Sequence, residues 1–124
     1  MNLYQGANVR RTLLAQSRIN STTATSILAG ASKVLYIPQI ITLCNTTASD
    51  ATFRLYFHAT GTTYDQTTAI FYDDTVLANK TISLIEGVDF VGMYLDTSTG
   101  NIAWAEGTAN AITLTMWGLE IKFP

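Results

Sequence analysis

ATFRLYFH, residues 51–58, is the stretch of this 124-residue chain that decides its fold class. Apolar Phe53, Leu55 and Phe57 alternate there with polar and amphipathic residues. A period of two predicts a β-strand with one buried face. Because burial of a large apolar side chain contributes roughly 1.5–3 kcal/mol, the three together predict that this strand lies on a hydrophobic core.

The other face of the same strand presents Arg54, Tyr56 and His58. Arg and Tyr are residue types that contribute much of the binding energy at protein–protein interfaces. We therefore predict that these three side chains form an interaction surface on the outside of the fold.

Short segments rich in β-branched and aromatic residues flank this strand, and turn residues separate them. The segments are residues 10–19, 22–29, 33–45, 69–72, 81–84, 90–96, 102–105 and 112–123. The first two are predicted to form a hairpin, and no segment has a convincing helical period. About eight short strands indicate an all-β fold, and we predict a jelly-roll-like antiparallel β-sandwich with an extended N-terminal arm.

Two positions predict irregular strands. Pro38 has no backbone N–H, so the strand that contains it is expected to be broken, bulged or at an edge there. In the last segment, the apolar residues change parity at Gly118, and a β-bulge is therefore predicted at Trp117-Gly118.

The length of the chain fits one folded unit. Residues 1–20 are predicted to form the N-terminal arm and first strand, and residues 21–124 the β-sandwich domain. Met1–Val9 has no hydrophobic periodicity, which is typical of an arm that becomes ordered on a partner.

The composition is 48% apolar but only 13% charged, about half of the charged share of an ordinary soluble domain. Hydroxyl and small side chains must cover much of the surface. Desolvating a hydroxyl costs far less than desolvating an ion, so such a surface suits contact with other protein. The composition therefore predicts a subunit of an assembly.

The net charge of −2 argues against a nucleic-acid partner, because such proteins have a clear positive excess. Arg10, Arg11 and Arg18 gather near the start, and we predict that they anchor the arm on a protein partner. No apolar run is long enough to span a bilayer, and no secretion signal is visible. We expect a protein made in a host cytoplasm, with no membrane partner.

Catalytic and metal-binding patterns are weak. The chain has one histidine, His58, and one cysteine, Cys44, and no nucleophile elbow or phosphate-binding loop. Cys44 is predicted to be a small buried hydrophobe. Asp73 and Asp74 have the chemistry of a Ca²⁺ loop, but Asp is common in turns because its side chain bonds the local backbone. We predict a protein that is not an enzyme and that needs neither cofactor nor metal.

Carbohydrate binding is the alternative that the aromatic residues leave open. Sugar-binding jelly rolls are known, and aromatic faces stack on sugar rings. The candidate residues are Trp104, Trp117, Tyr64, Tyr72 and Tyr94. Their spacing does not define a regular platform.

Several segments between residues 33 and 121 resemble small structural proteins of tailed-bacteriophage virions. They are Ile41–Thr47, Ala51–Leu55, Ala69–Asp73, Leu77–Ile82, Ala109–Thr115 and Trp117–Glu120. These motifs describe a sandwich with particular turns rather than an active site. Residues 1–32 have no counterpart in the resemblance.

The resemblance implies a virion location and a non-enzymatic role. Proteins of that kind act as capsid cement or decoration proteins, or as parts of the neck, tail or baseplate. It also implies symmetric self-association, with a homotrimer as the expected state, and binding to the major capsid protein or to other virion proteins. A carbohydrate-binding module, either free or as a receptor-binding part of a phage tail, is the alternative function.

Overall fold

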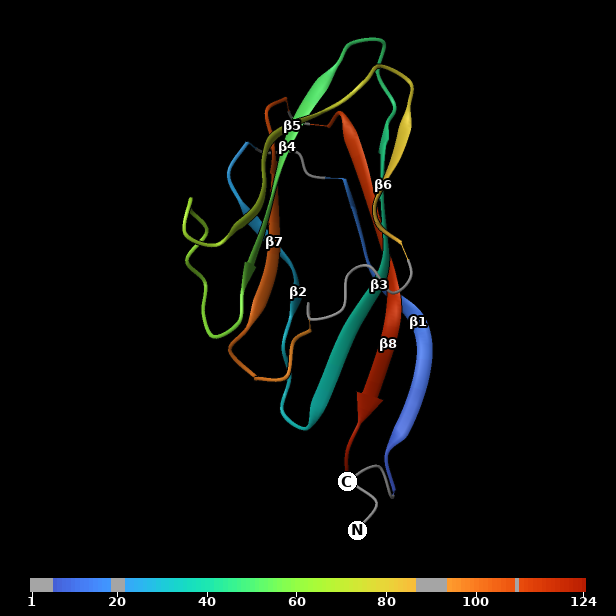
Figure 1. Ribbon diagram of the computed structural model, residues 1–124, viewed down its shortest axis with the longest axis vertical. Coiled ribbons are helices and arrows are strands. Elements are labelled where there is room, and N and C mark those ends of the chain that lie inside the picture. The colour runs from blue at the N-terminus through green and yellow to red at the C-terminus, as the bar shows by residue number, and fades with distance from the viewer. Residues whose placement is uncertain (1–5, 19–21, 87–93, 109) are drawn as a thin grey trace.

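In the computed structural model, which describes residues 6–18, 22–86, 94–108 and 110–124, the chain forms two four-stranded antiparallel sheets packed face to face (Figure 1). The strands are β1 (Asn8–Arg18), β2 (Thr25–Ala29), β3 (Val34–Asn45), β4 (Ala51–His58), β5 (Ala69–Val76), β6 (Thr81–Glu86), β7 (Asn101–Glu106) and β8 (Ile112–Lys122). No helix in this part of the chain is long and apolar enough to cross a membrane.

The strand order identifies the sandwich as a jelly roll. One sheet has the order β1-β8-β3-β6 and the other the order β2-β7-β4-β5. The first strand therefore pairs with the last, the second with the seventh, the third with the sixth and the fourth with the fifth, all antiparallel. This is the pairing of one long hairpin wrapped across two sheets. The fold predicted from the sequence is confirmed.

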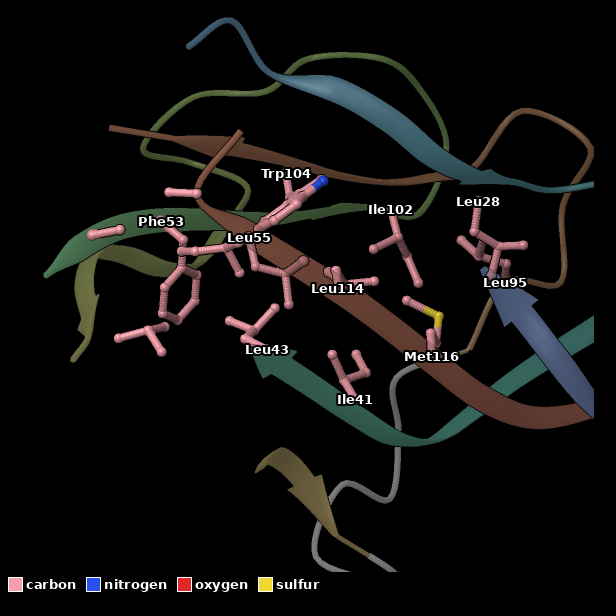
Figure 2. Packing of buried hydrophobic residues seen from close by; sticks show 14 residues of the cluster. Leu28, Ile41, Leu43, Phe53, Leu55, Leu95, Ile102, Trp104, Leu114 and Met116 are labelled. Atoms are coloured by element: carbon pink, nitrogen blue, oxygen red, sulfur yellow. The ribbon is translucent and has the colours of Figure 1, made fainter. Parts of the chain in front are cut away.

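The core lies between the two sheets, and Figure 2 shows the side chains that fill it. Phe53 and Leu55 of β4 are 1% and 0% exposed, and Phe57 packs against the same cluster. Leu43 of β3 and Leu114 of β8 face them from the other sheet. The alternation in residues 51–58 therefore predicted the buried face correctly.

Pro38 lies in β3 beside a bulge. The pairing of β3 with β8 shifts between Pro38 and Ile40, which leaves Gln39 as the additional residue. The pairing of β1 with β8 shifts in the same region, between Leu13 and Ala15. The prediction of a bulged strand at Pro38 is confirmed.

The bulge predicted at Trp117-Gly118 occurs at that level of the sheet but in other strands. Trp117 and Gly118 are paired on both sides, and the additional residues belong to β1 and β3. A Cβ at position 118 would collide with the carbonyl oxygen of Ile37. Gly118 therefore allows a close approach of the β3 backbone and does not form the bulge itself.

The predicted hairpin of the first two strands is wrong. β1 and β2 belong to different sheets, where they pair with β8 and β7. β1 also begins at Asn8, two residues before the predicted start of the strand. Each strand is amphipathic, so each needs only some partner in a sheet, and the local sequence does not specify which strand that partner is.

One further difference concerns a turn. The predicted turn at Asp73-Asp74 lies inside the continuous strand β5, where Asp73 has a φ of 55° and the pairing with β4 gains an additional residue. Asp tolerates this left-handed conformation, so the strand continues through it. The strand predicted at residues 90–96 lies mostly outside the described residues, and Leu95 makes an isolated antiparallel bridge with Tyr36.

Candidate interaction surfaces

The outward side of the sheet β1-β8-β3-β6 is named here the β8 face. Its central positions are Thr113, Thr115, Trp117 and Leu119 on β8, and Leu35, Ile37, Ile40, Thr42 and Cys44 on β3. The inward neighbours of these positions include Ile41, Leu43 and Met116, which are 0% exposed. None of the residues at these outward positions is charged, and Glu120 and the exposed Lys122 follow them at the end of β8.

An exposed apolar row crosses the middle of the β8 face. Trp117 pairs directly with Leu13 on one side and with Ile40 on the other. Directly paired residues share a face, with Cβ atoms about 4.5–5.5 Å apart. Their exposed fractions are 46% for Trp117, 40% for Leu13 and 44% for Ile40. A contiguous exposed apolar group of this kind is typical of a docking surface.

Hydroxyl side chains continue the β8 face beyond that row. Thr115 pairs with Thr42, and Thr42 pairs with Ser83 of β6. Gln16 of β1 donates a hydrogen bond from Nε2 to Oγ1 of Thr115 at 3.1 Å. Such groups can be covered by a partner at low desolvation cost, because they are neutral and can re-form hydrogen bonds across an interface.

The three arginines predicted to anchor the arm all lie on the edge strand β1. Arg10 makes an ion pair with Glu120 at 3.4 Å. Arg18 donates a hydrogen bond to the carbonyl oxygen of Asn110 at 3.0 Å and another to Oγ1 of Thr46 at 2.8 Å. Their role in binding a partner stays a prediction.

Of the expected arm, residues 8–18 form β1 itself, and residues 1–5 lie outside the described part. Arg11 has no ion pair among the described residues, and it is exposed. The described portion of the arm is therefore a strand of the sandwich whose outer edge is not paired with another described strand.

The outward side of the sheet β2-β7-β4-β5, named here the β4 face, is partly covered by the connection between β4 and β5 (Figure 1). The ring of Tyr64 in that connection lies 6.1 Å from the ring of Tyr56, centroid to centroid. Tyr56 is only 3% exposed as a result. His58 accepts a hydrogen bond at Nδ1 from the backbone N–H of Thr63 at 3.0 Å.

Arg54 is half-buried, as His58 is, and its side chain is 37% exposed. Its Nε and Nη2 donate to the two carboxylate oxygens of Asp73 at 2.6 and 3.1 Å. Its guanidinium also lies 3.9 Å from the ring centroid of Tyr72. The bond from Arg54 lowers the pKa of Asp73, and the same bond raises the pKa of Arg54. The geometry brings Arg54, Tyr56 and His58 to one face, and their role as an interface stays a prediction.

Two hollows adjoin this group on the β4 face. One has a volume of about 340 Å³ and is lined by Arg54, Tyr56, Tyr64 and Asp73 among others. The second, of about 430 Å³, shares the first three of those residues and adds Tyr72. Both fall in the size range of small-molecule sites.

The residues considered for carbohydrate binding separate in the fold. Trp104 is 0% exposed in the core, so it is not available to a ligand. Trp117 lies on the β8 face, and Tyr94 is 46% exposed but lines neither hollow. Tyr64 and Tyr72 come together beside Arg54. Sequence spacing could not reveal this group, because the bulge in β5 and the fold of a loop create it.

Cys44 and His58 point outward from different sheets, so the sandwich separates them and they do not form a catalytic pair. Cys44 is half-buried on the β8 face, which corrects the expectation of a buried hydrophobe. The reason is parity, because Leu43 and Asn45 occupy the inward positions on either side. Among the described residues no group of His, Cys, Asp and Glu could hold a metal ion.

Glu106 is a buried carboxylate at the end of β7. It is 2% exposed, and its Oε1 accepts a hydrogen bond from the backbone N–H of Ala111 at 3.1 Å and another from that of Ile112. Its Oε2 is buried and has no hydrogen-bond partner in the described part of the chain. Burial raises the pKa of this carboxyl group. Glu106 therefore ties the β7–β8 turn to the end of the core.

Comparison with known proteins gives a likeness of fold. A chain of the T13 IBDV viral particle is similar with a TM-score of 0.51 and 9% identity over 95% of this chain and 31% of that chain. This chain thus spans about a third of its length. The Tobacco streak virus coat protein is similar with a TM-score of 0.46 and 16% identity, over 100% of this chain and 91% of that chain. No protein-family model and no curated protein matches the sequence.

Proposed function

We propose that this protein is a non-enzymatic structural subunit of a virion, and specifically a capsid cement or decoration protein. The β8 face is its attachment surface, and capsid subunits are its partners. The observation that supports this most directly is the absence of charged side chains at the outward positions of residues 35–44 in β3 and 113–119 in β8. The jelly-roll topology, which is common among viral capsid proteins, supports it independently.

The β8 face has the size that docking needs. β1, β8 and β3 have 11, 11 and 12 residues. At about 3.4 Å per residue and about 4.8 Å between strands, they project an area of about 500 Å². Because side chains protrude from the sheet, the accessible area of this face is larger than its projected area. It approaches the roughly 800 Å² that each partner buries in a standard interface.

The energetic logic is that attachment covers apolar and hydroxyl groups without stripping water from ions. The row of Leu13, Trp117 and Ile40 supplies the apolar contact. The threonines beyond it supply hydrogen bonds, and Arg11 and Arg18 at the edge supply charge at the rim. Residues 1–20 extend this contact to a neighbouring subunit, and a homotrimer is the symmetric state that we propose.

A location in the neck, tail or baseplate is the closest alternative, because the same surface would serve there. Reconstitution on particles decides between them. Particles produced without the gene are incubated with the purified protein and separated by sedimentation, and capsids without tails are tested in parallel. Binding to tail-free capsids supports the cement function, whereas binding that requires the tail supports the alternative.

The variant Trp117→Thr tests the surface itself, and Tyr72→Thr is the matched control on the β4 face. The two side chains have similar exposed fractions, 46% and 42%. We expect the first variant to lose attachment and the second to keep it. If Tyr72→Thr loses attachment and Trp117→Thr keeps it, the attachment surface is instead the face of Arg54, Tyr56 and His58, as the sequence predicted.

A further inference from the structure

We propose that the β4 face contains a binding site for a neutral saccharide, formed by Arg54, Tyr64, Tyr72 and Asp73 over the floor made by Tyr56. The site is independent of the attachment surface, because the two lie on opposite outer sides of the sandwich. A virion subunit with both would hold the particle with one sheet and present the other to a glycan.

The shape of the site is the first argument. The hollows of about 340 and 430 Å³ share Arg54, Tyr56 and Tyr64, so they meet at these side chains. Each is large enough for a small organic ligand. Two adjoining hollows separated by one shared wall suit two linked rings better than one compact ligand.

The charge balance of the site excludes the common anionic ligands. Arg54 is the one cation among the described residues that line the hollows, and Asp73 already neutralises it through two hydrogen bonds. Asp65 adds a further carboxylate to the second hollow, and its hydrogen bonds with Thr67 lower its pKa. A phosphate or a nucleic acid would therefore meet no net positive charge. A neutral ligand does not need positive charge in its site.

The hydrogen-bonding pattern fits adjacent hydroxyl groups. Arginine has five N–H donors in a fixed plane, and Asp73 occupies two of them. The carboxylate of Asp73 keeps lone pairs for further donors. A donor and an acceptor fixed side by side match a pair of neighbouring sugar hydroxyls, each of which both donates and accepts. The ion pair thus orients two groups that a vicinal diol can bridge.

The aromatic rings supply the apolar contact that sugar rings use. Tyr72 stays 42% exposed although the guanidinium of Arg54 lies against its ring, so ring surface remains open. Tyr64 stands over Tyr56 with an interplanar angle of 41° and lines both hollows. Among the described residues, no Leu, Ile, Val, Phe or Met side chain lines either hollow, which argues against an apolar ligand.

The test is an NMR titration of the whole protein with methyl glycosides of glucose, galactose, mannose and N-acetylglucosamine, and with disaccharides of each. We expect at least one to shift the amide signals of Tyr64, Tyr72 and Gly107, which surround the hollows. Tyr72→Ser should weaken that binding roughly tenfold, since a ring contact contributes up to about 1.5 kcal/mol. Asp73→Asn should weaken it as well, because it removes the carboxylate that orients Arg54.

Two controls keep this result separate from the proposed function. Tyr94→Ser removes a similarly exposed tyrosine that lines neither hollow, and it should leave binding unchanged. Trp117→Thr should leave saccharide binding unchanged while it reduces attachment to particles. The proposal is wrong if none of the glycosides shifts these signals at its solubility limit, or if Tyr72→Ser and Tyr94→Ser behave alike.

Discussion

Replacement of Trp117 by threonine should weaken attachment of the protein to its partner without weakening its fold. Trp117 is 46% exposed in the isolated subunit, at the centre of the row that it forms with Leu13 and Ile40. Threonine keeps the preference for a β-strand and extends the hydroxyl pattern of its neighbour Thr115. The change therefore removes apolar contact area and little else.

The magnitude follows from the exposed area. A tryptophan side chain presents at most about 250 Å², and an exposed fraction of 46% leaves about 115 Å² for a partner to cover. At about 25 cal/mol per Å², that area is worth about 3 kcal/mol of binding free energy. Each 1.4 kcal/mol is a factor of ten, so we expect binding to weaken by roughly 100-fold. The unfolding free energy should change by less than about 0.5 kcal/mol, as for other surface positions.

The assay measures bound protein against free concentration on particles that lack the native protein, with urea unfolding of the same samples as the control for folding. Tyr72→Thr, on the opposite sheet, provides the comparison for loss of an exposed ring. Equal binding by Trp117→Thr and the unchanged protein would refute the assignment of the β8 face, because no docking on that face could leave the central ring uncovered.

Three predictions concern the fold. Leu55→Ala should reduce the unfolding free energy by about 2–5 kcal/mol in urea titration, since Leu55 is 0% exposed in the core. Gly118→Ala should reduce it by about 1–3 kcal/mol, because the new Cβ meets the carbonyl of Ile37; a neutral result would mean that β3 moves away freely. Burial raises the pKa of Glu106, so its contribution to stability is greatest below the pKa of the unfolded state and falls as the pH rises through the folded pKa. Glu106→Gln removes the titrating group, so stability measured by thermal melts should fall less steeply as the pH rises. Glu106→Ala should destabilise the protein at every pH, because it leaves the N–H groups of Ala111 and Ile112 without their acceptor.

The sequence by itself determined the class of the fold and the inner face of β4. The alternation of Phe53, Leu55 and Phe57 follows from the geometry of a strand, whose successive side chains point to opposite sides. The shortage of charged residues likewise predicted a surface with few ions, and the use of that surface for protein contact stays a prediction.

Only the tertiary structure decided which strands are neighbours, and with that which exposed residues meet. Leu13, Ile40 and Trp117 are far apart in the chain, and they form one row because β1 and β3 both pair with β8. Arg54 meets Asp73 because β5 gains a residue where Asp73 adopts a left-handed conformation. Strand pairing and bulges depend on the whole core, because an amphipathic strand can bury its apolar face beside many different partner strands. Both surfaces arise from this pairing of strands that are distant in the sequence, and no local sequence pattern specifies that pairing.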